Sequence, residues 1–468
     1  MTLSDDRLSA LHRFGPVWDT VLDNLDLPSL KTLRLTSKRM AEACIHHRFQ
    51  GFIEHQTTDL GTKSLKSLAA LAAHPLGRGV KHVTVLAAVY DTTSVERILE
   101  TKKIQQHQSN GIIHSRASRS ATEEELSQFR SELEWVQENK RDQEETSEDT
   151  IADLLVGILQ AFGVLNRVEL EATPICGRDD ESQSVAHFRD WRAAWEHAAR
   201  AYRIAMKALV RSKATVEKLT IYRDTLRFGV SPRHIASQVQ WLHAQADAGD
   251  LKGIKEFALC IGIGSMSADE ENQHLAAAAE LLKVIPNLET LDLQFYVAKS
   301  GSEAQDPRSV IFQNIASATH LLSLKRCRLR GAQTSRESLM QLMTNSPNMT
   351  SLDLDDVVLL GGAEWSEVLP ALVKGLPSLG QLRLSNLWGP RGFMNVDLVG
   401  RSRALVENKT AWVVPCLGGL RVHTILLEGD ELKQDIKFRP RPGGRPLGSP
   451  QAHNWMLRRE MEYAPYWD

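Results

Sequence analysis

A short pattern, leucine-x-x-leucine-x-leucine, recurs along this chain and limits its possible folds more than any other feature. A Pro-Asn or Pro-Ser pair stands directly before each clear copy, as at Pro286-Asn287 and Pro377-Ser378. The alternation of apolar and polar residues that ends each copy predicts a short strand with one buried face. The clear copies are Leu288-x-x-Leu291-x-Leu293, Met349-x-x-Leu352-x-Leu354 and Leu379-x-x-Leu382-x-Leu384.

The copies follow one another at a nearly constant spacing. A copy at Leu321-x-x-Leu324 is degenerate, because Arg326 stands where an apolar residue is expected. With that copy included, the steps between successive second apolar positions are 33, 28 and 30 residues. A last copy is expected near Leu420–Leu427. Looser copies precede the clear ones at Val80-x-x-Val83-x-Val85, Leu165-x-x-Val168-x-Leu170, Val216-x-x-Leu219-x-Ile221 and Ile254-x-x-Phe257-x-Leu259.

The segments between these copies have helical periodicity, as at 274–285, 337–346 and 366–376, and they end at Pro or Gly. A unit of one strand and one helix cannot bury its apolar faces alone, so the units must stack on one another. The predicted fold class is therefore an α/β solenoid shaped like a horseshoe. An ordinary α/β domain with a parallel sheet is the alternative.

Residues 13–50 form a different, compact apolar block. Pro16 suits the first turn of a helix, where its missing N–H costs nothing. Apolar residues then recur at steps of three and four, and the segment Asp26–Ser29 ends this helix and begins a second one. Thr36-Ser37 begins a third segment. A block this small is not expected to be stable alone, so it should dock onto the rest of the chain or onto another protein.

Three short helices separated by turns at these positions resemble an F-box. The resemblance depends on the proline before the first apolar stripe, on the turn at 27–31 (LPSLK) and on the run at 33–40 (LRLTSKRM). The start departs from the family pattern, with Gly15-Pro16-Val17-Trp18 and an acidic Asp19 one place late. The repeats that follow resemble the irregular leucine-rich repeats found behind F-boxes. A pair of helices that only caps the end of a solenoid is the alternative for this block.

The resemblance implies an adaptor of a cullin-RING ubiquitin ligase, in which the F-box binds a Skp-family adaptor protein and the repeats present a protein substrate. It leaves open which apolar residues of the block face the adaptor and which pack inside. The set predicted for this role is Pro16, Val17, Val21, Leu22, Leu25, Leu30 and Leu33.

Residues that alternate with the buried leucines should point outward on the concave side of the sheet. Acidic residues predominate among them, which suggests a substrate with a basic patch. The predicted substrate face is Glu169, Glu171, Tyr222, Asp292, Gln294, Asp353, Asp355 and Arg383.

The expected domain organisation is a flexible start at 1–12, the helical block at 13–50, the solenoid at 51–436 and a Pro-, Gly- and Arg-rich linker with a terminal helix at 437–468. A charged insertion interrupts the solenoid at about 101–150. Its first part, 101–120, carries four basic and no acidic residues, whereas 121–150 carries eleven acidic and three basic ones and predicts a helix at about 122–140. Such a charged segment is either a solvated insertion or an arm that contacts a partner.

Composition and motifs argue against several functional classes. A net charge of −2 does not suit a dedicated nucleic-acid binder. Five widely separated cysteines without C-x-x-C predict neither disulfides nor zinc, and the chain shows no signal peptide and no membrane-spanning run, so we expect a cytosolic or nuclear protein.

The candidates for chemistry are weak. Gly262-Ile263-Gly264 is followed by Ser267 at the position where a dinucleotide-binding loop has its third glycine. Cys44, His46 and His47 have the wrong spacing for zinc. We therefore predict a non-catalytic adaptor without cofactor or metal. A repeat scaffold unrelated to any ligase is the second hypothesis, and an enzyme on an α/β domain is the third.

Overall fold

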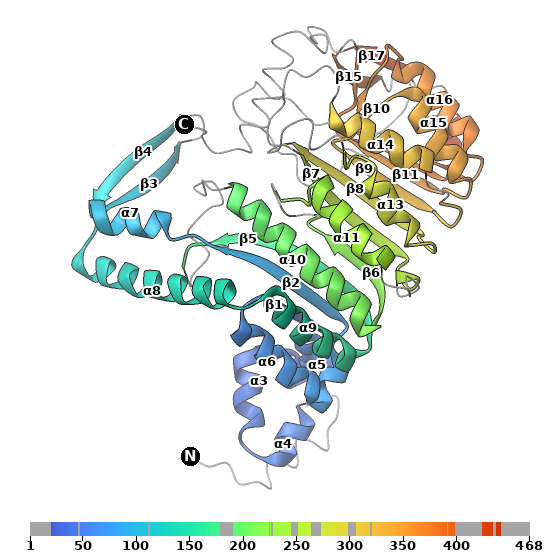
Figure 1. Ribbon diagram of the computed structural model, residues 1–468. Helices are drawn as coiled ribbons and strands as arrows, with labels where there is room; N and C mark the ends of the chain where they lie inside the picture. Colours follow the sequence, from blue (N-terminus) through green and yellow to red (C-terminus); the bar gives the residue numbers. More distant parts are fainter. Residues whose placement is uncertain are drawn as a thin grey trace.

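The computed structural model describes residues 20–44, 47–110, 113–177, 191–223, 225, 228–244, 251–263, 273–297, 306–318, 321–390, 392–397, 424–433 and 437–440. Its main feature is a ten-stranded sheet in which strands adjacent in space follow one another along the chain (Figure 1). All neighbouring pairs are parallel except the last, β13 with β16. The strands, in order across the sheet, are β1 (His55–Asp59), β2 (His82–Tyr90), β5 (Val164–Ile175), β6 (Thr215–Ile221), β7 (Glu256–Ile263), β8 (Thr290–Val297), β9 (Arg326–Arg330), β11 (Ser351–Asp355), β13 (Gln381–Ser385) and β16 (Thr424–Glu428).

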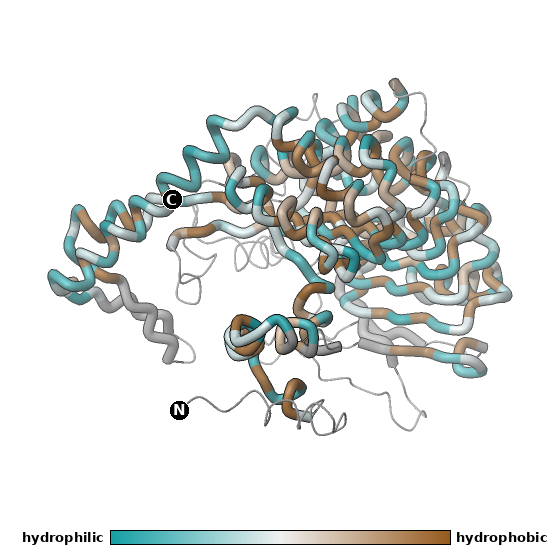
Figure 2. Tube along the Cα trace, turned by 90° about the horizontal axis from the view of Figure 1, so that it is seen from below, coloured by the Kyte–Doolittle hydropathy of each residue, from teal (hydrophilic) through white to brown (hydrophobic). Residues whose placement is uncertain are grey.

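The helices that connect these strands lie together on one face of the sheet, as the two views in Figures 1 and 2 show. Consecutive helices pack against each other along the whole row. The helical segments expected at 274–285, 337–346 and 366–376 are confirmed as α13, α15 and α16. The helices of this layer are α6 (Thr62–Ala73), α9 (Glu148–Phe162), α10 (Trp191–Ser212), α11 (Pro232–Ala244), α13 (Ala277–Lys283), α14 (Pro307–Ala318), α15 (Arg336–Asn345) and α16 (Trp365–Gly375).

The apolar positions of the repeats form continuous rows across the sheet, and these rows face the helices. The strand registers align the second apolar position of each copy with that of the next. Every member of this row is at most 2% exposed, which explains why the pattern has to repeat in register. The row consists of Val83, Val168, Leu219, Phe257, Leu291, Cys327, Leu352, Leu382 and Leu427.

One copy lies in a different frame from the sequence interpretation. The degenerate copy at Leu321-x-x-Leu324 is in fact Leu324-x-x-Cys327-x-Leu329, and all three of its apolar residues are buried. The registers pair Cys327 and Leu329 with the apolar positions of β8 and β11. Reading Leu324 as the second apolar position was wrong, because Cys327 is a small apolar residue that can occupy a leucine position.

The turns before the strands are also tied to each other. The side-chain amide of Asn287 donates to the Lys252 carbonyl at 2.9 Å, and that of Asn348 donates to the Leu322 carbonyl at 2.8 Å. These bonds join each turn to the equivalent turn of the preceding repeat. They give a physical reason for the Pro-Asn pairs in the sequence.

The charged insertion forms helices and a hairpin in its described residues. It comprises α7 (Thr93–Thr101), the hairpin β3 (Lys103–Asn110) and β4 (Ile113–Ser120), and α8 (Glu123–Glu145). The helix expected at about 122–140 is thus confirmed, and it begins with a capping box in which Thr122 and Glu125 bond reciprocally. In Figure 1 this arm extends away from the sheet. The hairpin was not expected, because its sequence lacks regular apolar alternation.

The arm is anchored where its long helix returns to the sheet. The Asp142 carboxylate accepts a hydrogen bond of 2.7 Å from the backbone N–H of Thr62, at the start of α6. Arg200 of α10 donates to the Thr146 carbonyl at 2.9 Å. The apolar face of α10 packs into the core, where Tyr202 and Met206 are fully buried.

The N-terminal block forms helices that join the β1 edge. Residues 20–23 are helical, and α3 (Leu27–Arg34), α4 (Lys38–Ala43) and α5 (His47–Glu54) follow. Asp26 and Ser37 cap α3 and α4, since their side chains accept bonds from the N–H groups of Ser29 and Met40. The sequence predicted the starts of these two helices at the same positions.

The C-terminal part contains a second, smaller sheet that the repeat pattern did not predict. It consists of two-residue strands at the outer ends of the repeats, continued by two antiparallel strands. β16 is antiparallel, so the copy expected near Leu420–Leu427 does not continue the parallel repeat, and the expected terminal helix lies outside the described residues. The elements are β10 (Gln333–Thr334), β12 (Val358–Leu359), β14 (Trp388–Gly389), β15 (Gly392–Asp397), β17 (Lys437–Pro440) and the 3-10 helix η6 (Gly429–Lys433). Within the described ranges, no helix combines the length and the apolarity that crossing a bilayer requires.

The repeat row predicts a large difference between two leucines. Leu352 is fully buried in the row, whereas Leu322 is 61% exposed in a turn. We expect Leu352→Ala to lower the free energy of unfolding by about 2–5 kcal/mol, and Leu322→Ala to change it by less than about 0.5 kcal/mol. Urea unfolding monitored by circular dichroism measures both. Equal effects of the two substitutions would contradict the register described above.

Candidate functional site

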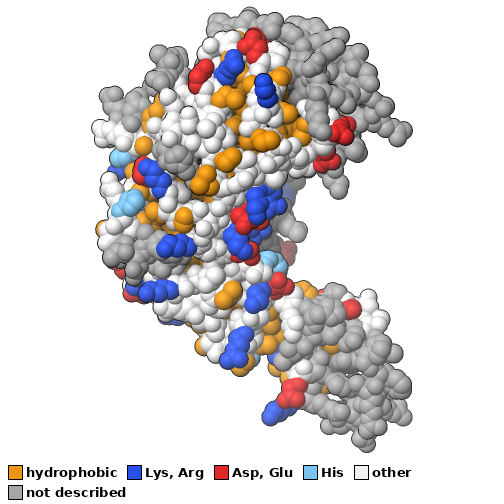
Figure 3. Space-filling model, turned by 90° about the vertical axis from the view of Figure 1, so that its right-hand side faces the viewer, with side chains coloured by type: hydrophobic (Ala, Val, Ile, Leu, Met, Phe, Trp, Pro, Cys, Tyr) orange, Lys and Arg blue, Asp and Glu red, His pale blue; other side chains and the backbone are white. Residues whose placement is uncertain are grey.

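The face of the sheet opposite the helices is lined by polar and charged side chains. Figure 3 shows the molecule bent around a hollow on its right-hand side, where Lys, Arg, Asp and Glu side chains gather. The strand registers arrange the outward positions of the repeats in straight rows, as they do the buried ones. We call the rows that begin at Arg167 and Glu169 the first and second polar rows.

The first polar row runs along the beginnings of the strands, and its charged residues form ion pairs. Glu256 of this row contacts cations on both sides, with Lys218 Nζ 2.8 Å from its Oε2 and Arg326 Nη2 3.0 Å from its Oε1. The row consists of Arg167, Lys218, Glu256, Thr290, Arg326, Ser351 and Gln381.

The second polar row contains a chain of ion pairs at the centre of the face. Asp292 Oδ2 lies 2.7 Å from Arg223 Nε and 4.0 Å from Arg328 Nη1, and Arg328 Nε lies 3.1 Å from Asp353 Oδ2. The side chains of Asp292 and Asp353 are only 7% and 16% exposed. The row consists of Glu169, Thr220, Ala258, Asp292, Arg328, Asp353 and Arg383.

Burial and charge oppose each other in this chain of ion pairs. Burial raises the pKa of Asp353, although the guanidinium groups of Arg328 and Arg383 favour its charged form. Burial also lowers the pKa of Arg328, and the nearby Arg330 lowers it further. The opposite charges of Arg328 and Asp353 thus offset the cost of burying each of them. Removal of Arg328 leaves the charge of Asp353 poorly exposed and without its ion-pair partner.

The residues predicted for the substrate face lie in three different environments. Glu171 and Arg383 are exposed, and Glu169, Gln294, Asp353 and Asp355 are half-buried. Asp292 lies on the face but is buried beneath its arginine partners.

Tyr222 does not belong to the face, so its prediction was wrong. It adopts a left-handed backbone conformation with φ of 55° directly after β6, which ends the alternation of the strand. Its side chain is fully buried, and its hydroxyl donates to the Ala198 carbonyl of α10 at 2.7 Å.

The sequence interpretation missed the arginines of β9, namely Arg326, Arg328 and Arg330. The frame error at this strand concealed their alternation with Cys327 and Leu329. In the registers Arg328 stands between Asp292 of β8 and Asp353 of β11, and Arg330 stands opposite Asp355 of β11. The face is therefore mixed in charge rather than acidic.

The apolar set of the N-terminal block divides into packed and exposed residues. Leu22 and Leu30 are fully buried, and Leu25 and Leu33 pack partly against the same core. Val21 is 41% exposed, whereas Pro16 and Val17 lie outside the described residues.

Two further apolar residues of the block are also exposed. Leu35 is 88% exposed and Phe52 is 37% exposed. The sequence pattern did not separate Leu35 from the packed leucines. In the structure Leu35 follows the last turn of α3, where the apolar stripe has ended.

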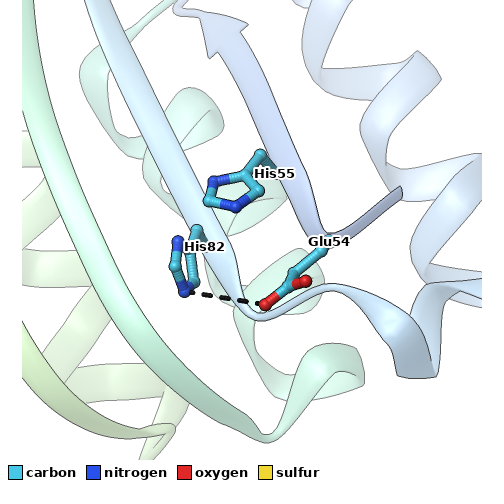
Figure 4. A group of neighbouring side chains, drawn as sticks. All are labelled: Glu54, His55 and His82. Carbon is cyan, nitrogen blue, oxygen red and sulfur yellow. Dashed lines mark ion pairs between the residues drawn. The ribbon is translucent and has the colours of Figure 1, made fainter. Parts of the chain in front are cut away.

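A second group of side chains lies where the block meets the sheet. Glu54 ends α5, His55 begins β1 and His82 begins β2 (Figure 4). Their potential ligand atoms all lie within 4.8 Å of one another. The sequence interpretation missed this group because 26 residues separate His55 from His82, a spacing that matches no zinc motif.

Comparison with models of known protein families and with curated protein sequences finds no match for this chain.

The ion-pair chain predicts unequal roles for two arginines of the second polar row. Arg328→Ala removes the ion-pair partner of the poorly exposed Asp353, whereas Asp292 keeps Arg223, so we expect a loss of about 3 kcal/mol in the free energy of unfolding at pH 7. Arg383→Ala, at an exposed position of the same row, should cost less than about 0.5 kcal/mol. Chemical unfolding of both variants provides the measurement.

The pH dependence supplies an internal control. The pKa of Asp353 is already raised, and removing Arg328 raises it further, because a cation that favours the charged form is lost. Protonation of Asp353 as the pH falls then removes its unpaired negative charge. The destabilisation by Arg328→Ala should therefore shrink between pH 7 and pH 4, to about half of its value at pH 7. A constant loss over this range would show that the missing packing of the arginine, rather than charge, is responsible.

Proposed function

We propose that this protein is a substrate-recognition adaptor of a Skp–cullin–F-box type ubiquitin ligase. In this proposal the N-terminal block is an F-box that binds a Skp-family adaptor, and the repeats form a leucine-rich repeat horseshoe whose charged face binds a protein substrate. The proposal assigns the chain no catalytic step. We also propose a cytosolic or nuclear location, where such ligases work.

The observation that carries the proposal is the presence of exposed apolar side chains on a small helical block at one end of the sheet. Val21, Leu35 and Phe52 are exposed although the block has its own buried residues. On a helical block whose sequence resembles an F-box, these exposed residues are the candidates for contact with the adaptor. A second, chemically different surface lies on the same chain, in the two polar rows.

Two surfaces on parts of the chain that share one core suit an adaptor. The work of such a protein is positioning, since holding a substrate lysine near a ubiquitin-charged enzyme raises the effective concentration of the lysine. The stacked repeats provide rigidity, because each one is packed and hydrogen-bonded to the next.

The charged face carries both signs of charge, and this changes the kind of substrate that we expect. The sequence alone suggested a partner with a basic patch. Because Arg223, Arg326 and Arg328 already pair with the acidic residues, we propose a partner that presents both signs of charge in a matching order.

A repeat scaffold whose N-terminal helices serve only as a cap is the second candidate. One observation favours it, because Leu22, Leu30, Met40 and Phe49 belong to the same continuous core as the sheet. Arg34 also lies 4.2 Å above the Phe49 ring and joins α3 to α5. A cap needs these buried contacts but no exposed apolar residues.

Co-expression with a Skp-family adaptor separates the two candidates. We expect the wild-type chain to co-purify with the adaptor, and Val21→Asp and Leu35→Asp each to reduce capture at least tenfold, by the roughly 1.4 kcal/mol lost with a buried apolar contact. Leu322→Asp places the same charge on an exposed leucine of a distant repeat and should have no effect. Absence of wild-type capture, or equal capture by all variants, would favour the scaffold.

The substrate face has its own test, which uses exposed residues so that the fold is preserved. Charge reversal by Glu171→Arg and Arg383→Glu should together weaken capture of a ubiquitinated partner from cell extract by about tenfold or more, since like charges then oppose each other across the interface. Quantitative proteomics of material captured by the wild type and the double variant gives the readout. Adaptor binding serves as the control and should stay unchanged.

A further inference from the structure

Glu54, His55 and His82 form a compact group at the edge of the sheet. His55 and His82 are register partners on neighbouring parallel strands, and their ring centroids lie 4.1 Å apart at an interplanar angle of 79°. His82 Nε2 lies 4.0 Å from Glu54 Oε1. Figure 4 shows the carboxylate of Glu54 pointing toward His82 from the chain segment that leads into β1.

These side chains are accessible from solvent. The side chains of His82 and Glu54 are 26% and 42% exposed, and His55 is exposed. Two imidazoles and a carboxylate provide two nitrogen donors and one oxygen donor. This is a donor set that borderline divalent ions bind, zinc among them, with a water or a further ligand at the fourth position.

We propose that Glu54, His55 and His82 bind a Zn²⁺ ion, with the fourth position open. In a tetrahedral site with bonds of about 2.1 Å, the ligand atoms are about 3.4 Å apart. Small side-chain rotations suffice to reach this separation, because the three ligand atoms already lie within 4.8 Å of one another, His55 is exposed and the Glu54 side chain is 42% exposed.

A neighbouring arginine does not prevent this binding. Arg167 is the register partner of His82 on the other side, and a free guanidinium there would repel a metal ion. Its Nη2 forms an ion pair with Glu169 Oε1, so the positive charge next to the site is offset.

A bound ion would join two parts of the fold. Glu54 belongs to the last helix of the N-terminal block, whereas His82 belongs to the second strand of the sheet. The ion would therefore add a link between the block and the sheet edge, where the Lys81 N–H already donates a hydrogen bond of 3.0 Å to the Glu54 carbonyl. This inference holds whether or not the block binds a Skp-family adaptor.

The test is a titration of the metal-free full-length chain with Zn²⁺ by isothermal calorimetry. We expect one equivalent to bind, and His55→Ala, His82→Ala and Glu54→Gln each to weaken binding by at least about tenfold, since each removes a donor. His243→Ala is the matched control, because His243 is an exposed histidine at the end of α11 and should leave the Kd unchanged.

Cobalt and hydrogen exchange provide independent readouts. Co²⁺ bound to this group should give tetrahedral ligand-field bands without a thiolate charge-transfer band, which excludes the cysteines as ligands. Zn²⁺ should slow amide exchange in residues 47–59 of the wild type and not of His82→Ala. The proposal is wrong if the folded wild type binds no Zn²⁺, or if His55→Ala and His82→Ala bind it as tightly as His243→Ala does.

Discussion

The whole fold depends on the burial of one repeated apolar row between the sheet and its helices. A single strand with its helix would leave half of this row exposed, so each unit requires a neighbour on both sides. The registers show how the requirement is met, since Leu291, Cys327 and Leu352 stand beside one another although they lie far apart in sequence. Once this row is aligned, the polar rows on the opposite face are aligned by the same registers. The charged face is thus a geometric consequence of the core.

Much of the architecture could be predicted from the sequence, because period and spacing depend on local rules. Alternation identified the strands around Val168, Leu219 and Leu352, and turn chemistry identified the starts of α3 and α4. The hairpin of β3 and β4 escaped prediction because its sequence lacks a regular alternation of apolar residues. The two-residue strands of the second sheet are too short to carry a periodic signal.

The site was harder to predict than the fold, since it depends on which residues meet across strands. A frame error of three residues in β9 hid Arg328 and made the face look acidic. Tyr222 was misplaced because a left-handed residue at a strand end reverses the direction of its side chain, and nothing in the local pattern announces that reversal. The group of Glu54, His55 and His82 arises from a register between two strands, which the sequence does not state.

The central claim is that the chain carries two separate binding surfaces, an apolar one on the N-terminal block and a charged one on the sheet. Hydrogen–deuterium exchange of the full-length chain, with and without a Skp-family adaptor, tests it most directly. The account predicts slower exchange in residues 20–44, with unchanged exchange in β7, β8, β9 and β11. Unchanged exchange in residues 20–44, or slowing in those strands, would contradict the separation of the two surfaces.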